Sequence, residues 1–249
     1  MLLDRMLYLN SRFSPMCAQK AMFTMARIPS LYIMLTFLCL SHAETTAKKD
    51  SSDVPFEEDY QYFCYQNASD AVAIQGKIYV RIQNFKNPKL PPLCDSAEQV
   101  AKLNNTHYIY TLAAVVPMFL NDTLVKFNTS FVLSMTGNHT TYNAMTYQYA
   151  SNEPPKLRKL MYLSPEQDCM IFVDNRTTTE KPKCQLLQPA NYANGSIPEM
   201  CLNVYNQNCP GENITVYYPY CQGLQEITLE ALSKILQQKR TTTPATEVC

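Results

Sequence analysis

The sequence contains no tryptophan, only five glycines and only three histidines among its 249 residues. It has no glycine-rich loop of the kind that cradles phosphates, and neither His-Glu-x-x-His nor Gly-x-Ser-x-Gly occurs. Beyond the N-terminal leader only His107 and His139 remain, and we expect both at exposed loop or strand-edge positions. The adjacent Glu57 and Glu58 fall in a stretch expected to be mobile. We therefore predict no catalytic residues, which favours a binding protein over an enzyme.

A membrane-spanning hydrophobic run is also lacking, because no apolar stretch reaches the roughly 20 residues that a membrane helix needs. The apolar run from Leu31 to Leu40 follows Arg27 and precedes a small-residue cleavage site at Ala43, as is typical of a secretory signal peptide. The predicted product is a secreted, extracellular monomer with no membrane partner. We expect an upstream extension at residues 1–24, the signal peptide at 25–43 and a disordered segment at 44–55.

Closely paired Cys-x-x-Cys ligands are absent, so the cysteines do not have the spacing of a zinc site, and we predict no metal and no cofactor. Removal of residues 1–43 takes away Cys17 and Cys39 and leaves eight of the ten cysteines, an even number that suits a disulfide framework. The remaining net charge of about −3 disfavours nucleic acid as a partner. The predicted half-cystines are Cys64, Cys94, Cys169, Cys184, Cys201, Cys209, Cys221 and Cys249.

Eight Asn-x-Ser/Thr sequons support the same secreted location. A used sequon must face solvent, so each one also orients the residues around it. The predicted glycosylation sites are Asn67, Asn104, Asn121, Asn128, Asn138, Asn175, Asn194 and Asn213.

Short segments with β-branched and aromatic residues dominate the rest of the chain. From Lys77, Ile78 and Val80 alternate with Tyr79 and Arg81, which is the period of a strand. Repeated strands at near-regular spacing predict an antiparallel barrel or sandwich. Further strand candidates are 108–116, 124–135, 140–150, 157–163, 170–173 and 185–187. We expect a short helix capped at Ser69-Asp70, a helical turn or two at 202–209, an amphipathic C-terminal helix at 224–240 and a tail at 241–249.

One strand can be oriented. If Asn128 carries a glycan, the alternate residues of this strand point inward, where they form either ordinary core packing or the lining of a ligand cavity. These inward residues are Val125, Phe127, Phe131, Leu133 and Met135. Candidate ligand contacts on other strands are Tyr79, Arg81, Tyr108, Tyr110, Tyr147 and Phe172.

The C-terminal half carries a family pattern: Cys169-Met-Ile-Phe, Cys184-Gln-Leu-Leu, Ile197-Pro-Glu-Met-Cys-Leu-Asn-Val-Tyr and Val216-Tyr-Tyr-Pro-Tyr-Cys. This order resembles the tick salivary lipocalins of the histamine-binding group. The resemblance implies an all-β, eight-stranded antiparallel lipocalin barrel over residues 56–223, with a short N-terminal helix and a C-terminal helix. It also implies the bridges Cys94–Cys221 and Cys169–Cys201. Of three possible pairings among the other four cysteines, we favour one that joins Cys184 to Cys209.

Two departures from the pattern bear on the ligand. Family members that bind biogenic amines typically carry Cys-Asp and Glu-Leu-Trp or Glu-Leu-Tyr where this chain has Cys169-Met170 and Gln185-Leu186-Leu187. An amine in an apolar cavity needs a carboxylate to offset its desolvation, so we expect a lipid or eicosanoid rather than histamine or serotonin. Arg81, Lys126, Arg158 and Lys159 are candidates to meet an acidic head group, although alternation places Lys126 outward.

The resemblance thus implies a salivary protein that sequesters a small host mediator and dampens host inflammation or haemostasis. The alternative is an immune modulator that binds a host plasma protein, such as a complement component, through its loops.

Overall fold

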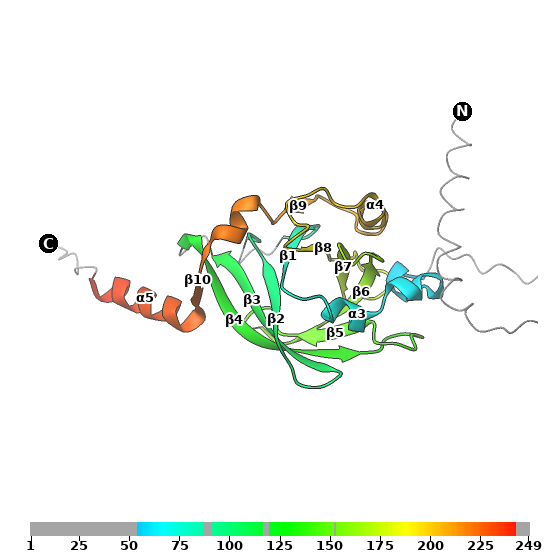
Figure 1. Ribbon diagram of the computed structural model, residues 1–249, viewed down its shortest axis with the longest axis horizontal. Helices are drawn as coiled ribbons and strands as arrows, with labels where there is room; N and C mark the ends of the chain where they lie inside the picture. Colours follow the sequence, from blue (N-terminus) through cyan, green and yellow to red (C-terminus); the bar gives the residue numbers. More distant parts are fainter. Residues whose placement is uncertain (1–53, 87–90, 117–119, 152, 243–249) are drawn as a thin grey trace, which may run out of the picture. The chain divides into compact units, whose positions relative to one another are not determined.

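The computed structural model describes residues 54–86, 91–116, 120–151 and 153–242 (Figure 1). The expected upstream extension, the signal peptide, nearly all of the 44–55 segment and Cys249 lie outside these residues. None of the described helices combines the length and hydrophobicity that a bilayer span requires.

Eight antiparallel strands close into a barrel. Each strand pairs with the next along the chain, and β8 pairs with β1 to close the ring. The sequence-based fold class is therefore confirmed. The strands are β1 (Lys77–Gln83), β2 (Ser96–Lys102), β3 (His107–Val116), β4 (Leu120–Ser134), β5 (Ala144–Tyr147), β6 (Lys156–Leu163), β7 (Met170–Asp174) and β8 (Cys184–Pro189).

Two short strands extend the barrel wall. β9 (Ile214–Thr215) pairs with the end of β1. β10 (Gln225–Thr228) runs parallel to the first half of β4. The helix expected from residue 224 therefore begins later, as α5 (Leu229–Thr242), because the preceding four residues form β10 instead.

The remaining helical elements come before β1 or after β8 in the chain. The N-terminal elements are η2 (Phe56–Glu58), η3 (Tyr60–Tyr65) and α3 (Ala68–Val72). Asn67 caps α3 by accepting a hydrogen bond from the Ser69 N–H, so the cap lies two residues before the predicted one. The helical turn expected near residues 202–209 is α4 (Glu199–Asn208), and η4 (Pro219–Gly223) precedes β10.

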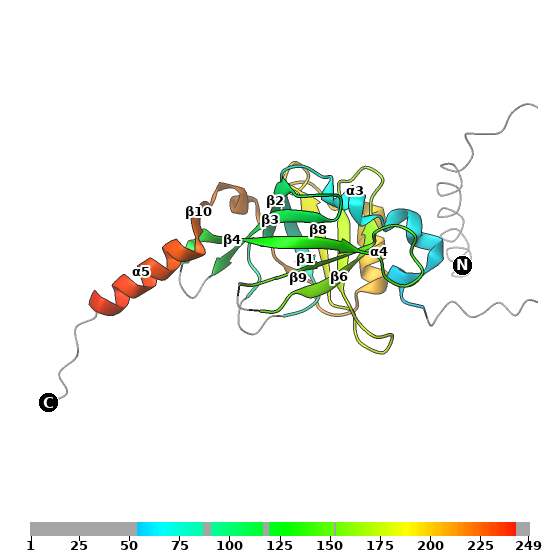
Figure 2. The ribbon, with the colours of Figure 1, turned by 90° about the horizontal axis from the view of Figure 1, so that it is seen from below.

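The wall formed by β6, β7 and β8 is buried on both faces. Its inner face belongs to the barrel core, while its outer face packs under α4 through Ile171, Val173 and Leu186 (Figures 1 and 2). Three disulfides join described residues: Cys94–Cys221, Cys169–Cys201 and Cys184–Cys209. All three match the predicted pairings, and the last two tie α4 and its C-terminal end to β7 and β8. Cys64 is disulfide-bonded as well.

The N-terminal segment closes one end of the barrel. α3 contributes the buried Ala68, Ala71 and Val72 to the barrel core. His139 is only 7% exposed, and its Nε2 lies 2.8 Å from Gln66 Oε1, so the expectation of an exposed histidine was wrong for this residue. The reason is tertiary: the ring of Phe63 from η3 stacks on His139 at 3.6 Å between centroids.

Candidate ligand-binding site

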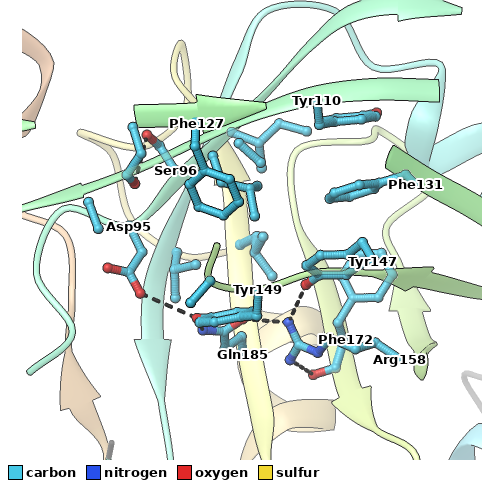
Figure 3. A pocket seen from close by; sticks show the side chains of 18 of the residues that line it. Asp95, Ser96, Tyr110, Phe127, Phe131, Tyr147, Tyr149, Arg158, Phe172 and Gln185 are labelled. Atoms are coloured by element: carbon cyan, nitrogen blue, oxygen red, sulfur yellow. Dashed lines mark hydrogen bonds between the residues drawn. The ribbon is translucent and has the colours of Figure 1, made fainter. Parts of the chain in front are cut away.

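The barrel encloses a largely apolar cavity of about 230 Å³ (Figure 3). Its lining comes from α3, from strands β1 to β8 and from one residue of α5, Leu229. Alternate residues of β1, Ile78 and Val80, line the cavity, as do Tyr110, Leu112 and Ala114 of β3. A closed barrel of eight strands is just wide enough to hold one small ligand.

Three aromatic rings form a stack along one wall of the cavity (Figure 3). Tyr110 and Phe131 are 4.2 Å apart between ring centroids, and Phe131 and Tyr147 are 4.1 Å apart. All three side chains are buried, and they come from three neighbouring strands, β3, β4 and β5. The stack gives the cavity a flat, rigid apolar surface.

A set of polar side chains lies across the barrel at the edge of this cavity (Figure 3). We call these six residues the polar belt: Gln83, Asp95, Tyr147, Tyr149, Arg158 and Gln185. Gln185 Nε2 donates to Tyr149 Oη at 2.6 Å and to Gln83 Oε1 at 2.8 Å. Tyr149 Oη in turn donates to Asp95 Oδ2 at 3.4 Å. The belt is therefore a connected network rather than a group of isolated polar residues.

Arg158 is the cation of the belt, and it is only 3% exposed. Its NH1 donates to Tyr147 Oη at 3.0 Å and to Gln185 Oε1, while its Nε lies 2.9 Å from Asp174 Oδ1. Burial alone would lower the pKa of Arg158, but Tyr147, Asp174 and Tyr149 outweigh it and raise this pKa above its ordinary value. Arg158 is thus charged and already neutralised by Asp174.

Asp95 is the carboxylate of the belt, and part of its surface faces the cavity. Burial raises the pKa of Asp95 to about 6, although hydrogen bonds from the Leu93 backbone and from Tyr149 act in the opposite direction. Among the side chains that the structure describes, no cation forms a salt bridge with Asp95. Near neutral pH, Asp95 is therefore an anion with no salt-bridging cation among the described residues.

A second pocket of about 210 Å³ lies against the polar belt, which it shares with the apolar cavity through Asp95, Tyr147, Tyr149 and Arg158. Charged side chains dominate this outer pocket, in contrast to the apolar cavity. Its further lining residues are Gln83, Phe85, Lys86, Pro92, Glu153, Lys156, Asp174 and Lys183. In the part of the chain that the structure describes, no cluster of His, Cys, Asp or Glu could hold a metal ion.

Most of the predicted contact residues face the barrel interior. Six of them line the apolar cavity, while Tyr108 and Leu133 belong to the adjoining core without lining it. The six are Tyr110, Val125, Phe127, Phe131, Tyr147 and Phe172.

Three predicted contact residues lie elsewhere. Tyr79 and Arg81 were assigned to the wrong face of β1: Tyr79 packs on the outer side against Tyr217, with ring centroids 4.8 Å apart, and Arg81 donates to Gln188 there. The tyrosine is buried under the C-terminal segment rather than by a ligand. Met135 is 56% exposed, because β4 ends at Ser134 and the inward alternation ends with it.

The four basic residues predicted to contact an acidic ligand head group also differ in where they lie. Only Arg158 reaches the cavity. Arg81 lies outside, Lys126 pairs with Glu226 at 2.9 Å, and Lys159 is buried beside Glu58 of η2 at 2.6 Å.

Sequence reasoning missed Asp95 and Tyr149. Asp95 follows a half-cystine and precedes β2, outside every predicted strand. Tyr149 lies within the predicted strand 140–150, but β5 already ends at Tyr147 and the residue was not singled out. A signal was present at Arg158, since a charged residue next to the apolar run 160–163 must have a buried partner or face a cavity.

The sequons lie mostly on the surface. Asn128 is exposed, and its Oδ1 accepts a hydrogen bond from Thr111 at 2.7 Å on the outer face of the barrel, as the strand orientation required. Asn67 is half-buried, and the side chain of Asn121 lies outside the described parts. The other exposed sequon residues are Asn104, Asn138, Asn175, Asn194 and Asn213.

An eight-stranded antiparallel barrel around an internal cavity defines the lipocalin class of binding proteins. The family model described as tick histamine-binding protein matches residues 56–223, and the chain belongs to this family. No curated protein sequence matches the chain.

Solved structures of low identity resemble this fold. Insecticyanin from the tobacco hornworm Manduca sexta is 13% identical, with a TM-score of 0.48 over 66% of this chain and 90% of its own. Japanin from Rhipicephalus appendiculatus, solved bound to cholesterol, is 12% identical, with a TM-score of 0.41 over 57% and 92%. Lobster apocrustacyanin A1 is 8% identical, with a TM-score of 0.41 over 57% and 76%.

Proposed function

We propose that this protein is secreted and sequesters one small amphipathic molecule, a mediator made by a host, inside its barrel. The observation that carries the proposal is the apolar cavity with a polar belt at its edge. Such a site suits a ligand with an apolar body and one polar group, because each buried methylene contributes about 0.8 kcal/mol and the belt can bond the polar end. The disulfides and the exposed sequons support secretion.

The charges around the cavity restrict which polar group the ligand can carry. Arg158 is neutralised by Asp174, whereas Asp95 has no cationic partner among the described residues. A ligand carboxylate would therefore lie near an uncompensated anion, which costs free energy in a site of low dielectric constant. A lipid with a neutral polar end fits better than an acidic eicosanoid.

An amphipathic amine is the second candidate, and Asp95 is the observation that favours it. A ligand ammonium beside Asp95 would replace the missing cation and lower the pKa of this carboxyl. Asp95 would then substitute for the two acids that the family pattern has at the positions of Met170 and Gln185. The aromatic stack would also receive the apolar part of such a ligand.

Native mass spectrometry of the secreted, glycosylated protein tests these proposals. We expect a bound small molecule whose mass is lost on denaturation. Ala114→Trp fills the cavity from β3 and should abolish this adduct, whereas Val100→Trp, on the exposed side of β2, should leave it unchanged. A protein without any adduct that captures a host plasma protein would instead support the loop-mediated alternative.

A further inference from the structure

The C-terminal segment 225–232 forms part of the cavity wall. The edge of β4 that faces away from β3 is divided between two partners. β5 pairs with Val132–Ser134 near the end of β4, while β10 pairs with Thr123–Lys126 near its start (Figures 1 and 2). The first half of this edge of β4 is therefore covered by a strand that comes from near the end of the chain.

The region between these two pairings is a weak place in the wall. β5 ends at Tyr147, and the next residue, Gln148, donates from its backbone to Thr129 Oγ1 at 3.3 Å. Beyond this contact the chain turns at Ala150 and Ser151, which both line the cavity. Among the described strands, neither β5 nor β10 pairs with β4 between Lys126 and Val132.

Leu229 fills that position. It is the first residue of α5, and it lines the cavity together with Val125 and Phe127 of β4. Three residues further along α5, Leu232 is only 5% exposed and anchors the first turn of the helix. The rest of α5 continues away from the barrel (Figures 1 and 2).

The segment is held by contacts that can open one at a time. Glu226 forms salt bridges with Lys77 of β1 and Lys126 of β4, and all three side chains are partly exposed to solvent. Such pairs are individually worth about 1 kcal/mol or less, and β10 contributes only four residues of pairing. The Cys94–Cys221 bridge lies just before the segment 225–232, so the segment would stay attached to the barrel while β10 opens.

We propose that residues 225–232 cover a side entrance to the cavity, between β4 and the Ala150–Ser151 turn, and that Leu229 is a ligand-facing residue that sets the size of ligand admitted. This inference rests on the proposed binding function. Ligand would enter by local release of β10, which opens a short path to the aromatic stack. Loss of the exposed salt bridges of Glu226 would therefore change the rates at which ligand associates and dissociates, but not the affinity.

The test uses stopped-flow binding of N-phenyl-1-naphthylamine, a neutral apolar fluorophore, to the full-length secreted protein. Leu229→Trp should weaken its equilibrium binding about tenfold by filling the cavity next to Phe127. Glu226→Gln should raise the association and dissociation rates together by about threefold, with little change in the dissociation constant, because the cover opens more often.

Matched controls lie outside the segment 225–232. Leu236→Trp changes the same residue type further along α5, and Glu212→Gln removes an exposed salt bridge with Lys86 that is not part of the cover. Neither Leu236 nor Glu212 lines the cavity, so both variants should leave affinity and rates unchanged. If Leu229→Trp and Glu226→Gln behave like these controls while the wild type binds the probe, the side entrance is excluded and the cavity remains. If the wild type binds no probe, the proposed binding function fails, and the entrance with it.

Discussion

The two halves of the barrel wall are built differently. Strands β6 to β8 are buried on both faces, with the cavity on one side and α4 on the other. Strands β2 and β3 are covered less completely on the outside. Ala113 and Val115 near the end of β3 are buried beside Tyr217, but elsewhere their outer faces carry half-buried and exposed residues such as Val100. The half formed by β6 to β8 therefore resembles a protein core, whereas much of the other half is a thin wall between the cavity and solvent.

This difference separates stability from binding. Two of the three described disulfides tie α4 to the doubly buried half, which fixes β7 and β8. The thin half supplies Tyr110, Phe127 and Phe131 to the cavity, and its β4 edge carries the C-terminal cover. Stability should thus respond most to changes under α4, and ligand binding to changes on β3 and β4.

The largest expected effect comes from the bridge under α4. Replacing both Cys169 and Cys201 by alanine removes a link between residues 32 apart in sequence, and should lower the free energy of unfolding by roughly 4 kcal/mol. Urea denaturation of the secreted protein measures this change. If the midpoint stays within error of the wild type, α4 does not stabilise this half, and the contrast between the halves is lost.

A matched pair of isoleucines compares the outer faces directly. Ile171 on β7 is fully buried beneath α4, so Ile171→Ala should cost about 2–4 kcal/mol. Ile109 on β3 is only partly buried on the outer face, and Ile109→Ala should cost less than about 1 kcal/mol. Equal losses in denaturation experiments would show that the outer face of β3 is covered by something comparable to α4.

The last comparison concerns the charge in the cavity, and its effect on stability depends on pH. The pKa of Asp95 is about 6 in the folded protein, above its ordinary value of 3.8, so ionisation of Asp95 destabilises the fold. This penalty is absent below about pH 4, grows as the pH rises towards 6 and is complete above it.

Asp95→Asn should therefore stabilise the ligand-free protein at pH 7.5 by at most about 3 kcal/mol, which is the free-energy equivalent of the rise in the Asp95 pKa. At pH 3.5 the same substitution should have little effect on stability. Urea denaturation at the two pH values gives the comparison. Tyr149→Phe, which removes one hydrogen bond to Asp95, is the control and should not stabilise at either pH. A stabilisation by Asp95→Asn that is equal at both pH values would contradict an ionised, unpaired carboxylate.

The sequence allowed a good prediction of the fold but a partial one of the site. The strand from Leu124 was oriented correctly because one expected glycan fixes the face of every second residue. The inward face of β1 was not predicted correctly, because Tyr79 and Ile78 are both apolar enough for either face. A bulge between Val80 and Ile82 then turns Gln83 inward. No periodicity in the sequence announces that bulge.

The C-terminal helix is a second place where tertiary contacts overrule a prediction from local sequence. Its apolar spacing predicted helix from residue 224, but Gln225–Thr228 instead pair with the free edge of β4. Backbone pairing with an open strand edge outweighs a helical propensity that four residues alone cannot realise.

The sequence by itself indicated a β-rich, disulfide-bonded chain, seven of the eight strands and the outward sequon at Asn128. The family resemblance added the number of strands and two of the three described disulfide pairings. Only the tertiary structure decided what the cavity contains. Asp95, Tyr149, Arg158 and Leu229 come from a turn, a strand end, a strand start and a helix start, and no local pattern connects them. They meet because closure of the barrel brings residues that are distant in sequence together around one cavity.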